Sequence, residues 1–279
     1  MSKINLEDIQ AKLLEIAVYF DAFCRRNDVV YYLMGGSALG AIRHNGFIPW
    51  DDDIDVFMTS ENYIKFFKAC DVSLDTDNYY LQKENTSEWP LFFSKLRMNG
   101  TTFIENDTKD REMHKGFYID VMCLNNVSAN YVYRYIQFIA ARLITIKTIA
   151  ERGYITDSKL KKVTMIVFKE LIGNKTLRLL VKIVRSLNST NTKFVGHFFG
   201  RAKFNNTSFL SEFLGNPRYV DFSGVKLPVP HNVEKYLELR YGSKYMEMPD
   251  EKTKSLYPSH SAFVDLYNDY KKYDNNNNI

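Results

Sequence analysis

Asp51-Asp52-Asp53-Ile54-Asp55-Val56 is the stretch from which the fold of this 279-residue chain can be predicted. If a strand begins at Asp53, alternation places the side chains of Asp53 and Asp55 on one face. Two carboxylates held side by side repel each other, and their pKa values rise unless a cation lies between them. Hard oxygen ligands suit Mg²⁺ or Mn²⁺, and Mg²⁺ commonly binds substrate phosphates as well. We therefore predict a metal site at Asp53 and Asp55, with Asp51 and Asp52 in the supporting loop.

A glycine pair lies shortly before the acidic stretch. Gly35-Gly36 ends a β-rich run, and Ser37 to Arg43 is expected to be a short helix with Ser37 as its N-cap. Glycines let a backbone approach a phosphate closely, a helix start offers free N–H groups to an anion, and Arg43 could add a charge-assisted bond. Each motif alone is weak, because this turn is common and acidic runs are usually solvated. Together they favour a phosphate cradle beside a metal site, which is what phosphoryl or nucleotidyl transfer needs.

Asp120 is a candidate third carboxylate. It lies between apolar residues in Gly116–Cys123, a run that is typical of a buried strand. A buried charge needs a cation or hydrogen bonds, so we expect Asp120 to be a third metal ligand or the general base for an acceptor hydroxyl. An acid that is capped by backbone donors at a strand end is the alternative.

Three further side chains are candidates for binding a donor. Lys95 and Arg97 alternate along a predicted strand and therefore share a face, where they would contact phosphate or sugar; solvated edge charges are the alternative. Trp50 is a candidate for stacking on a base or for cation–π contact with a choline ammonium, with loop packing as its structural role. Three histidines lack the spacing of metal ligands and are interpreted as structural or surface residues, namely His44, His114 and His260.

Hydrophobic periodicity predicts an α/β (α+β) fold, with a mixed-sheet core and a helical insertion. Helices are expected at residues 6–26 and 60–70, across most of 129–203, and at 260–270. Strands are expected at residues 29–34, 53–58, 79–81, 91–98, 101–105 and 116–123. The expected organisation is a catalytic core (1–127), a basic helical region (128–205), a C-terminal segment that packs back on the core (206–274) and a disordered tail (275–279).

Charge is distributed unevenly along the chain. The formal net charge of +4 does not by itself imply a nucleic-acid partner, and none is expected. The segment from 129 to 203, however, has 15 Lys or Arg against three acidic residues, which makes it +12 and the remainder −8. One predicted helix has apolar residues on one side and basic residues on the other, namely Lys175, Arg178, Lys182 and Arg185. We expect this helix to dock on an anionic membrane surface, with a solubilising basic face as the alternative.

Cysteine use and apolar runs predict the compartment. Cys24, Cys70 and Cys123 form neither a CxxC motif nor a Cys/His cluster, so neither a disulfide framework nor a zinc site is expected. The N-terminus lacks the basic and apolar run of a signal peptide, and no stretch of about 18 uncharged apolar residues occurs. These features predict a cytoplasmic protein, peripheral at the inner face of the membrane if the basic region docks there.

The run from Gly35 to Asp55, GGSALGAIRHNGFIPWDDDID, resembles the signature of the LicD family. That family includes bacterial phosphocholine transferases and is related to fukutin and fukutin-related protein. Later blocks resemble the family as well, so that the resemblance covers roughly residues 1–125 and 215–260. These blocks are Phe93-Ser94-Lys95-Leu96-Arg97, Ile119-Asp120, Pro228-Val229-Pro230 and Tyr241-Gly242.

The resemblance implies a nucleotidyltransferase-type fold and a Mg²⁺-dependent transfer reaction. A phosphorylated alcohol would move from a CDP-linked donor, with CDP-choline favoured, to a sugar hydroxyl of a cell-surface glycan such as teichoic acid, lipopolysaccharide or capsule. CMP would leave, and the glycan acceptor could be linked to a lipid. By the same resemblance Asp53 and Asp55 bind the metal, Asp120 completes the acidic set, and Ser37 contacts the donor phosphate.

One departure and two alternatives stay open. Met122-Cys123-Leu124-Asn125 stands where the family often has Phe-Pro-Leu-Asp, which is compatible with a different alcohol. One alternative is an NTP-dependent nucleotidyltransferase, which would release pyrophosphate. The other is a non-catalytic membrane- or RNA-binding adaptor on the same scaffold, against which the clustered acids Asp53, Asp55 and Asp120 argue.

Overall fold

A computed structural model describes residues 4–106, 108, 110–152, 158–200, 202–255 and 259–274. The tail predicted at 275–279 lies outside the described residues. The elements of the first half are α1 (Leu6–Arg26), β1 (Tyr32–Leu33), α2 (Gly35–His44), β2 (Asp55–Thr59), α3 (Ser60–Ser73), β3 (Tyr79–Gln82), β4 (Ser94–Met98), β5 (Thr102–Glu105) and β6 (Tyr118–Val127). Those of the second half are α4 (Tyr131–Arg152), α5 (Lys159–Leu171), α6 (Asn174–Val184), β7 (Phe194–Gly196), η1 (Phe204–Asn206), β8 (Ser208–Leu210), η2 (Ser211–Phe213), β9 (Arg218–Phe222), β10 (Val225–Val229), α7 (Val233–Tyr241), α8 (Glu251–Lys254), β11 (Ser261–Asp265) and α9 (Lys271–Asp274).

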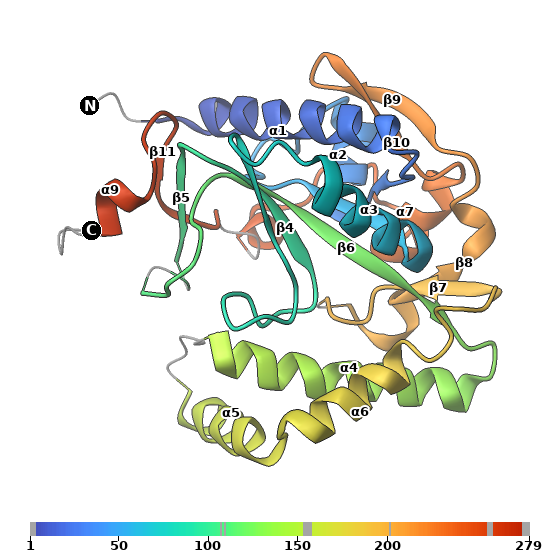
Figure 1. Cartoon of the computed structure of the whole chain (residues 1–279). Helices are drawn as coiled ribbons and strands as arrows, with labels where there is room; N and C mark the ends of the chain where they lie inside the picture. Colours follow the sequence, from blue (N-terminus) through green and yellow to red (C-terminus); the bar gives the residue numbers. More distant parts are fainter. Residues whose placement is uncertain are drawn as a thin grey trace.

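A mixed sheet with the strand order β1-β2-β6-β4-β3 forms the centre of the molecule (Figure 1). β2 and β6 pair in parallel, whereas the β1–β2, β4–β6 and β3–β4 pairs are antiparallel. The long strand β6 continues beyond β2 and pairs there with β7, which in turn pairs with β8. This arrangement confirms the predicted α+β class, because one parallel pair lies within a mostly antiparallel sheet.

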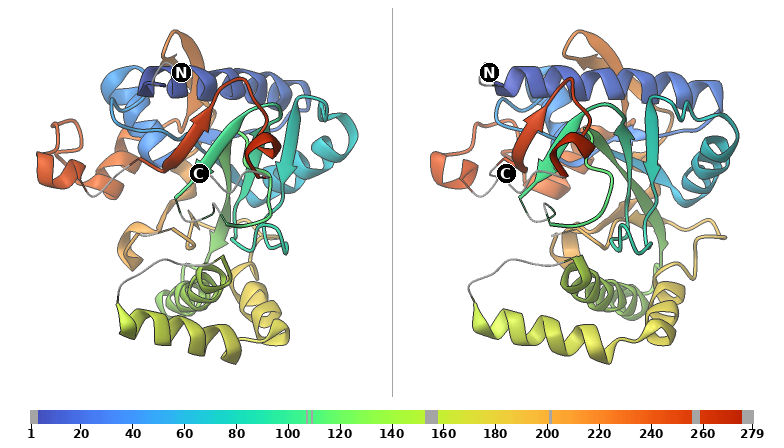
Figure 2. Two further views of the ribbon diagram at one scale, coloured as in Figure 1. Left: turned by 90° about the vertical axis from the view of Figure 1, so that its left-hand side faces the viewer. Right: turned by 60° about the vertical axis from the view of Figure 1, so that its left-hand side comes forward.

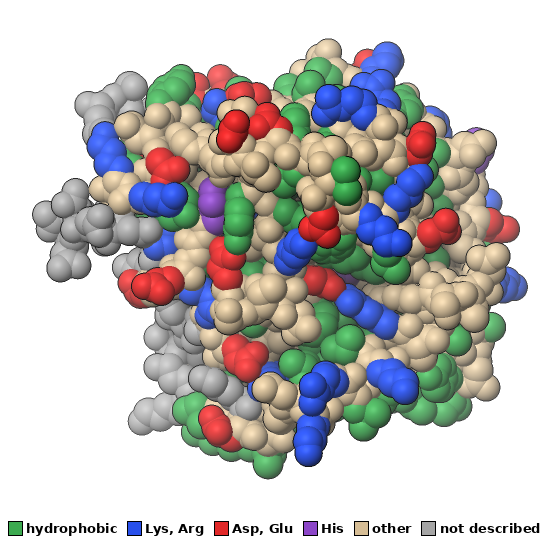
Figure 3. Space-filling model, in the orientation of Figure 1, with side chains coloured by type: hydrophobic (Ala, Val, Ile, Leu, Met, Phe, Trp, Pro, Cys, Tyr) green, Lys and Arg blue, Asp and Glu red, His purple; other side chains and the backbone are tan. Residues whose placement is uncertain are grey.

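Helices cover the sheet at two ends of the molecule. The two views of Figure 2 show α1 along one side of the sheet and α4, α5 and α6 together at the opposite end. α4 and α6 share a small core, in which Ala140, Ala141, Ile144 and Val184 pack with Phe92, Val127 and Phe198 from outside the helices. Hydrophobic side chains and Lys or Arg side chains both reach the surface along this lower edge of the molecule (Figure 3). Within the described ranges, no helix combines the length and the apolar character needed to cross a membrane.

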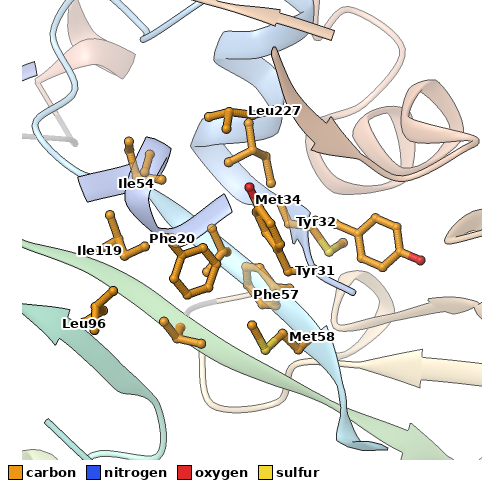
Figure 4. Close-up of a cluster of buried hydrophobic side chains, with 14 of the residues drawn as sticks. Phe20, Tyr31, Tyr32, Met34, Ile54, Phe57, Met58, Leu96, Ile119 and Leu227 are labelled. Atoms are coloured by element: carbon orange, nitrogen blue, oxygen red, sulfur yellow. The ribbon is translucent and has the colours of Figure 1, made fainter. Parts of the chain in front are cut away.

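The main hydrophobic core lies between α1 and the sheet (Figure 4). α1 begins at a capping box in which the Asn5 side chain accepts from the Asp8 N–H and the Asp8 side chain accepts from the Asn5 N–H. Its buried stripe includes Phe20, which is fully shielded and belongs to the same cluster as Ile119 of β6. Burial of a side chain of this size contributes about 2 kcal/mol. β6 therefore faces the core with Ile119, while the next residue, Asp120, projects to the other face of the sheet.

Two predicted helical stretches contain strands instead. Residues 194–196 form β7, because Val195 lies opposite Asn126 on the part of β6 that β2 leaves unpaired. The helix predicted at 260–270 is wrong, since residues 261–265 form β11, antiparallel to β5. Asp265 ends that strand by accepting hydrogen bonds from the N–H groups of Tyr267 and Asn268. In both places a long-range strand partner decides the conformation, and local periodicity does not report it.

Candidate functional site

Asp55 and Asp120 lie directly opposite each other on the parallel strands β2 and β6. The pairing is held at this end by the Asp120 N–H, which donates to the Ile54 carbonyl oxygen over 2.9 Å. Neighbouring strands are about 4.8 Å apart, so the two carboxylates project from adjacent backbone positions. Asp53 lies two residues before Asp55, where the acidic loop enters β2. The structure thus brings the three predicted acids to one edge of the sheet.

Burial and mutual repulsion raise the pKa values of these acids. Burial, together with the neighbouring Asp120 and Asp52 carboxylates, raises the pKa of Asp53 to about 6, although His260 opposes the rise. Burial and the Asp53 and Asp120 carboxylates raise the pKa of Asp55 well above its ordinary value. Asp51 belongs to the same group, because burial and repulsion from Asp53 raise its pKa to about 7. A cluster of acids that raise one another's pKa gains stability when a cation enters it.

The glycine pair makes room for two of the carboxylates. Gly35 has a φ of +61°, and a Cβ atom built on it would lie 3.0 Å from Asp55 Oδ2. A Cβ atom on Gly36 would lie 2.9 Å from Asp51 Oδ2. Any larger residue would therefore push against the acidic cluster, so the close approach that requires glycine is made by the protein's own carboxylates.

Ser37 holds Asp55 in place. The structure corrects the predicted cap, because α2 begins at Gly35 with Met34 as its N-cap, and Ser37 lies inside the helix. The Ser37 Oγ accepts a hydrogen bond from the Asp55 N–H over 2.8 Å. The Gly35 N–H donates to the Tyr236 hydroxyl over 3.0 Å, so the protein itself satisfies that backbone donor. Ser37 therefore ties α2 to the start of β2.

Asp52 and His260 form a link that the sequence analysis missed. His260 Nδ1 lies 2.8 Å from Asp52 Oδ1, and Asp52 Oδ2 accepts from the Ser259 hydroxyl over 2.6 Å and from the His260 N–H over 2.9 Å. Burial alone would raise the pKa of Asp52, but the hydrogen bonds from His260 and Ser259 hold it below its ordinary value. The same hydrogen bond raises the pKa of His260 to about 9, and His260 Nδ1 also lies 3.8 Å from Asp53 Oδ2. His260 is thus a cation beside the acidic cluster.

Lys95 and Arg97 belong to a buried ion network on the same face of the sheet. Lys95 Nζ lies 3.1 Å from Asp120 Oδ1, 3.3 Å from Glu105 Oε1 and 3.2 Å from the centre of the Tyr118 ring. Burial works against ionisation of Glu105, yet Lys95 and Arg97 lower its pKa to about 2. Burial and Glu105 raise the pKa of Asp120, while Lys95 opposes them. Lys95 therefore connects Asp120 to a second buried acid, Glu105, which the sequence analysis did not single out.

Two of the predicted donor contacts are occupied by the protein. Arg97 is fully buried, and its guanidinium donates to the Gln82 side chain and to the Gly116 carbonyl, each over 2.8 Å. Arg43 donates to the carbonyl oxygens of Tyr245 and Glu247, in the segment after α7. Both guanidinium groups therefore donate hydrogen bonds to the protein itself in this conformation.

Trp50 packs as a half-buried ring at the edge of the main core. The Lys254 ammonium lies 5.0 Å from the centre of its ring, and the His44 ring lies 6.5 Å away. The protein therefore supplies a cation–π partner of its own to this ring.

The acids at this end of β2 and β6 fit a divalent cation whose coordination would be completed by the substrate. In the part of the chain that the structure describes, no three His, Cys, Asp or Glu side chains are gathered as a ready-made metal cluster. Mg²⁺, however, is usually held by one or two carboxylates together with substrate phosphates and water. Asp53 and Asp55 offer such a pair of hard ligands, and their raised pKa values reflect the charge that a cation would offset. Asp120 lies beside the pair, with Lys95 as its partner.

Comparisons with known proteins show what the segment that holds this site is similar to. Residues 28–122 match the family model described as LicD/FKTN/FKRP, nucleotidyltransferase domain. The chain is 52% identical over 66 residues to the lipopolysaccharide cholinephosphotransferase LicD of Haemophilus influenzae, a match that covers 24% of this chain and 25% of that protein. It is 44% identical over 41 residues to an uncharacterized protein of Rickettsia typhi, which covers 15% of this chain and 13% of that protein. The matched stretch thus spans a quarter of the Haemophilus protein and less of the other.

A mixed sheet with acids at adjoining parallel strands, together with a glycine pair and a short helix, is consistent with the nucleotidyltransferase domain that the family model describes. Residues 28–122 contain every element of this arrangement from β1 to Asp120. This part of the chain is similar to the nucleotidyltransferase domain of the LicD family.

Proposed function

We propose that the chain transfers phosphocholine, or a similar phospho-alcohol, from a CDP-linked donor to a sugar hydroxyl of a cell-surface glycan, with lipopolysaccharide as the first candidate. The observation that carries the proposal is the pairing of Asp55 with Asp120, with Asp53 beside them, inside the segment that matches the family. The name of the Haemophilus relative supports the choice of phosphocholine and of lipopolysaccharide.

Asp53 and Asp55 would hold a Mg²⁺ or Mn²⁺ ion. When bound, the ion supplies charge neutralisation at the donor phosphates. The Gly35-Gly36 pair lets the backbone of α2 lie close to the carboxylates of Asp55 and Asp51, so the start of the helix supports the acids that would hold the ion. Ser37 fixes Asp55 through its backbone N–H and so fixes one ligand.

Asp120 would take the proton of the acceptor hydroxyl. Its raised pKa brings it closer to the range in which a carboxylate is an effective base, and Lys95 holds one of its oxygens at 3.1 Å. The acceptor oxygen would form a bond to the phosphorus of the phospho-alcohol as the bond to the CMP oxygen breaks, and CMP would leave with that electron pair. Lys95, which also pairs with Glu105, acts as a positioning residue for the base.

The experiment that tests the proposal is release of CMP from a panel of CDP-alcohols. The full chain would be incubated with Mg²⁺, lipopolysaccharide and CDP-choline, CDP-ethanolamine or CDP-glycerol in parallel. CMP release that depends on both the acceptor and one of the donors is the expected result. Pyrophosphate release from a nucleoside triphosphate, with no CMP from any CDP-alcohol, would overturn the proposal in favour of nucleotidyl transfer.

A further inference from the structure

Exposed hydrophobic side chains gather on the three-helix region. Of the twenty large hydrophobic side chains that are exposed in the described part of the chain, eleven lie between Tyr131 and Leu179, which is less than a fifth of the sequence. Soluble monomeric proteins rarely expose contiguous apolar patches of more than a few hundred Å². Patches above that size usually bind another protein or a membrane. The concentration therefore indicates an interaction surface on α4, α5 and α6.

On α5 these side chains form one stripe. Leu160, Val163, Val167 and Leu171 recur at intervals of three and four residues, so they lie on one side of the helix. Leu160 is 77% exposed and Leu171 is 71% exposed, which shows that the stripe points away from the small core of the region. An apolar stripe that faces outward along a whole helix is the reverse of what packing in a globular domain produces.

The first half of α4 has a second exposed apolar group. Its members occupy successive turns at the start of the helix: Tyr131, Val132, Tyr135, Ile136 and Ile139. Two of the five are tyrosines, which favour an interface because one end of the ring is apolar and the hydroxyl can remain in water. We call this group and the α5 stripe together the apolar face.

Basic side chains are exposed on α6, in the same three-helix region. Lys175, Arg178 and Lys182 of α6 are exposed, and the segment from 129 to 203 has a net charge of +12. Arg185, which was predicted to complete this basic stripe, turns inward instead and pairs with Glu84 over 2.6 Å, so the stripe has three members. Leu177, Leu180 and Val181 pack against the core of the region, as the other side of an amphipathic helix should.

We propose that the apolar face lies on the surface of an anionic lipid bilayer, with the basic side chains of α6 at the level of the headgroups. Apolar insertion and attraction between Lys or Arg and anionic lipids are the two contributions that hold an interfacial helix. A second copy of the chain would fit the apolar side chains but not the charge, because a symmetric dimer through this face would bring two segments of +12 together. Charge complementarity therefore favours lipid over self-association.

α4 connects this face to the acidic site. The exposed group is at its beginning, whereas at its other end the Arg152 guanidinium lies 5.8 Å from the centre of the Trp89 ring. The Lys95 ammonium lies 5.0 Å from the centre of the same ring. A bilayer that holds the start of α4 would thus keep the network around Asp120 at a fixed distance from the membrane. The proposal concerns binding and does not depend on the reaction assigned above.

Vesicle co-sedimentation of the full chain tests the proposal. The expected result is binding to vesicles of phosphatidylglycerol with phosphatidylcholine, little binding to phosphatidylcholine alone, and release by added salt. The triple variant Lys175→Glu/Arg178→Glu/Lys182→Glu should weaken the partitioning by about a hundredfold or more, because each basic residue near an anionic surface contributes about a factor of five. The double variant Leu160→Glu/Val163→Glu should weaken it as well, since it removes apolar insertion and adds negative charge.

A matched control uses exposed apolar residues elsewhere. Ile64 and Val72 of α3 are 56% and 88% exposed, and Ile64→Glu/Val72→Glu should bind vesicles as the unchanged protein does. All the substituted side chains are exposed, and circular dichroism melting would verify that each variant folds. Equal recovery in the supernatant with and without phosphatidylglycerol would overturn the proposal. So would a dimer that Leu160→Glu/Val163→Glu converts to a monomer, in a protein that shows no vesicle binding.

Discussion

Asp55 and Asp120 are direct partners in the one parallel strand pair of the central sheet in the described chain. Parallel pairing brings the two carboxylates to one edge from positions that are far apart in sequence, and antiparallel β4 adds Lys95 opposite Asp120. Two acids and a lysine are therefore fixed by three adjacent backbones. The electrostatics of the site depends on this register, since a shift by one residue would turn each of these side chains to the other face.

The first prediction concerns the acids of the acidic loop. Asp53→Asn and Asp55→Asn should each lower CMP release by about a hundredfold or more, because each would remove a charged ligand of the proposed metal ion. Neither should lower the melting temperature in metal-free buffer, since each relieves repulsion that raises the pKa of its neighbours. Asp71→Asn, at an exposed acid on α3, is the control and should retain activity. Near-normal turnover in Asp53→Asn or Asp55→Asn would show that the metal is held elsewhere.

The second prediction separates Asp120 from Asp51. Both belong to the same acidic cluster, but Asp120 lies opposite Asp55 in the sheet, whereas Asp51 lies in the loop against Gly36. Asp120→Asn should therefore abolish transfer to the acceptor, and Asp51→Asn should reduce it less. Single-turnover CMP release with saturating acceptor makes the comparison. A larger loss in Asp51→Asn would identify Asp51 as the third functional carboxylate.

The third prediction concerns the glycine turn. Gly36→Ala places a methyl group 2.9 Å from the present position of Asp51 Oδ2, so the carboxylate or α2 must shift. We expect lower CMP release and a lower melting temperature. Gly173→Ala is the control, because a Cβ atom on Gly173 meets no atom within 4 Å. It should leave activity unchanged, apart from a small loss of stability at the start of α6. Equal activity of the Gly36→Ala variant and the unchanged protein would mean that this contact is unimportant.

The fourth prediction is a pH dependence of stability that arises from His260. The folded-state pKa of about 9 lies above the ordinary value of 6.5, so folding favours the protonated ring. The resulting stabilisation is complete below pH 6.5 and is lost as the pH rises through 9. Because the ring is about half exposed, we expect about 1 kcal/mol, well below the full value of such a shift.

Melting in metal-free buffer between these pH values measures the loss. His260→Asn should be less stable than the unchanged protein at the lower pH, and the difference should shrink as the pH rises. His231→Asn, in the loop before α7, should show no such trend. A constant difference between the His260→Asn variant and the unchanged protein over the whole range would contradict the assignment.

The fifth prediction concerns the contact between α6 and the core. Arg185 pairs with the partly buried Glu84, so Arg185→Ala would leave that carboxylate without its cation. We expect a loss of about 3 kcal/mol of unfolding free energy, measured by urea denaturation. Lys182→Ala, at an exposed residue on the same helix, should cost much less. If Arg185→Ala leaves the free energy of unfolding unchanged, the pair contributes nothing to the docking of α6.

Local patterns predicted the part of the fold that local chemistry determines. The stripe of α1, the glycine pair and the alternation around Asp120 each depend on neighbouring residues, and the structure has helices and a strand there. The strand predicted from Asp53 begins at Asp55 instead, so Asp53 lies in the loop before β2. The start of α2 was displaced by two residues, because Gly35 at a φ of +61° begins the helix before Ser37. No periodicity signals such a conformation.

Long-range partners account for the rest. Asp52 and His260 are 208 residues apart, and nothing in the residues around either one indicates the other. Lys95 and Arg97 resemble exposed strand charges in sequence, and only the packing of β5 beside them supplies the buried Glu105. The strand β11 likewise exists because β5 offers an open edge. These contacts are set by tertiary structure and leave no local signal.

The link from His260 and Ser259 to Asp52 has a consequence for the order in which the protein is made. During synthesis the acidic loop leaves the ribosome some two hundred residues before the histidine that binds it. Until then the carboxylates from Asp51 to Asp55 lack both the imidazolium and the hydroxyl that hold Asp52 in place. In a nascent chain the residues of β2 and β6 are thus present well before the partners of Asp52, so the acidic loop can reach its final conformation only late in translation.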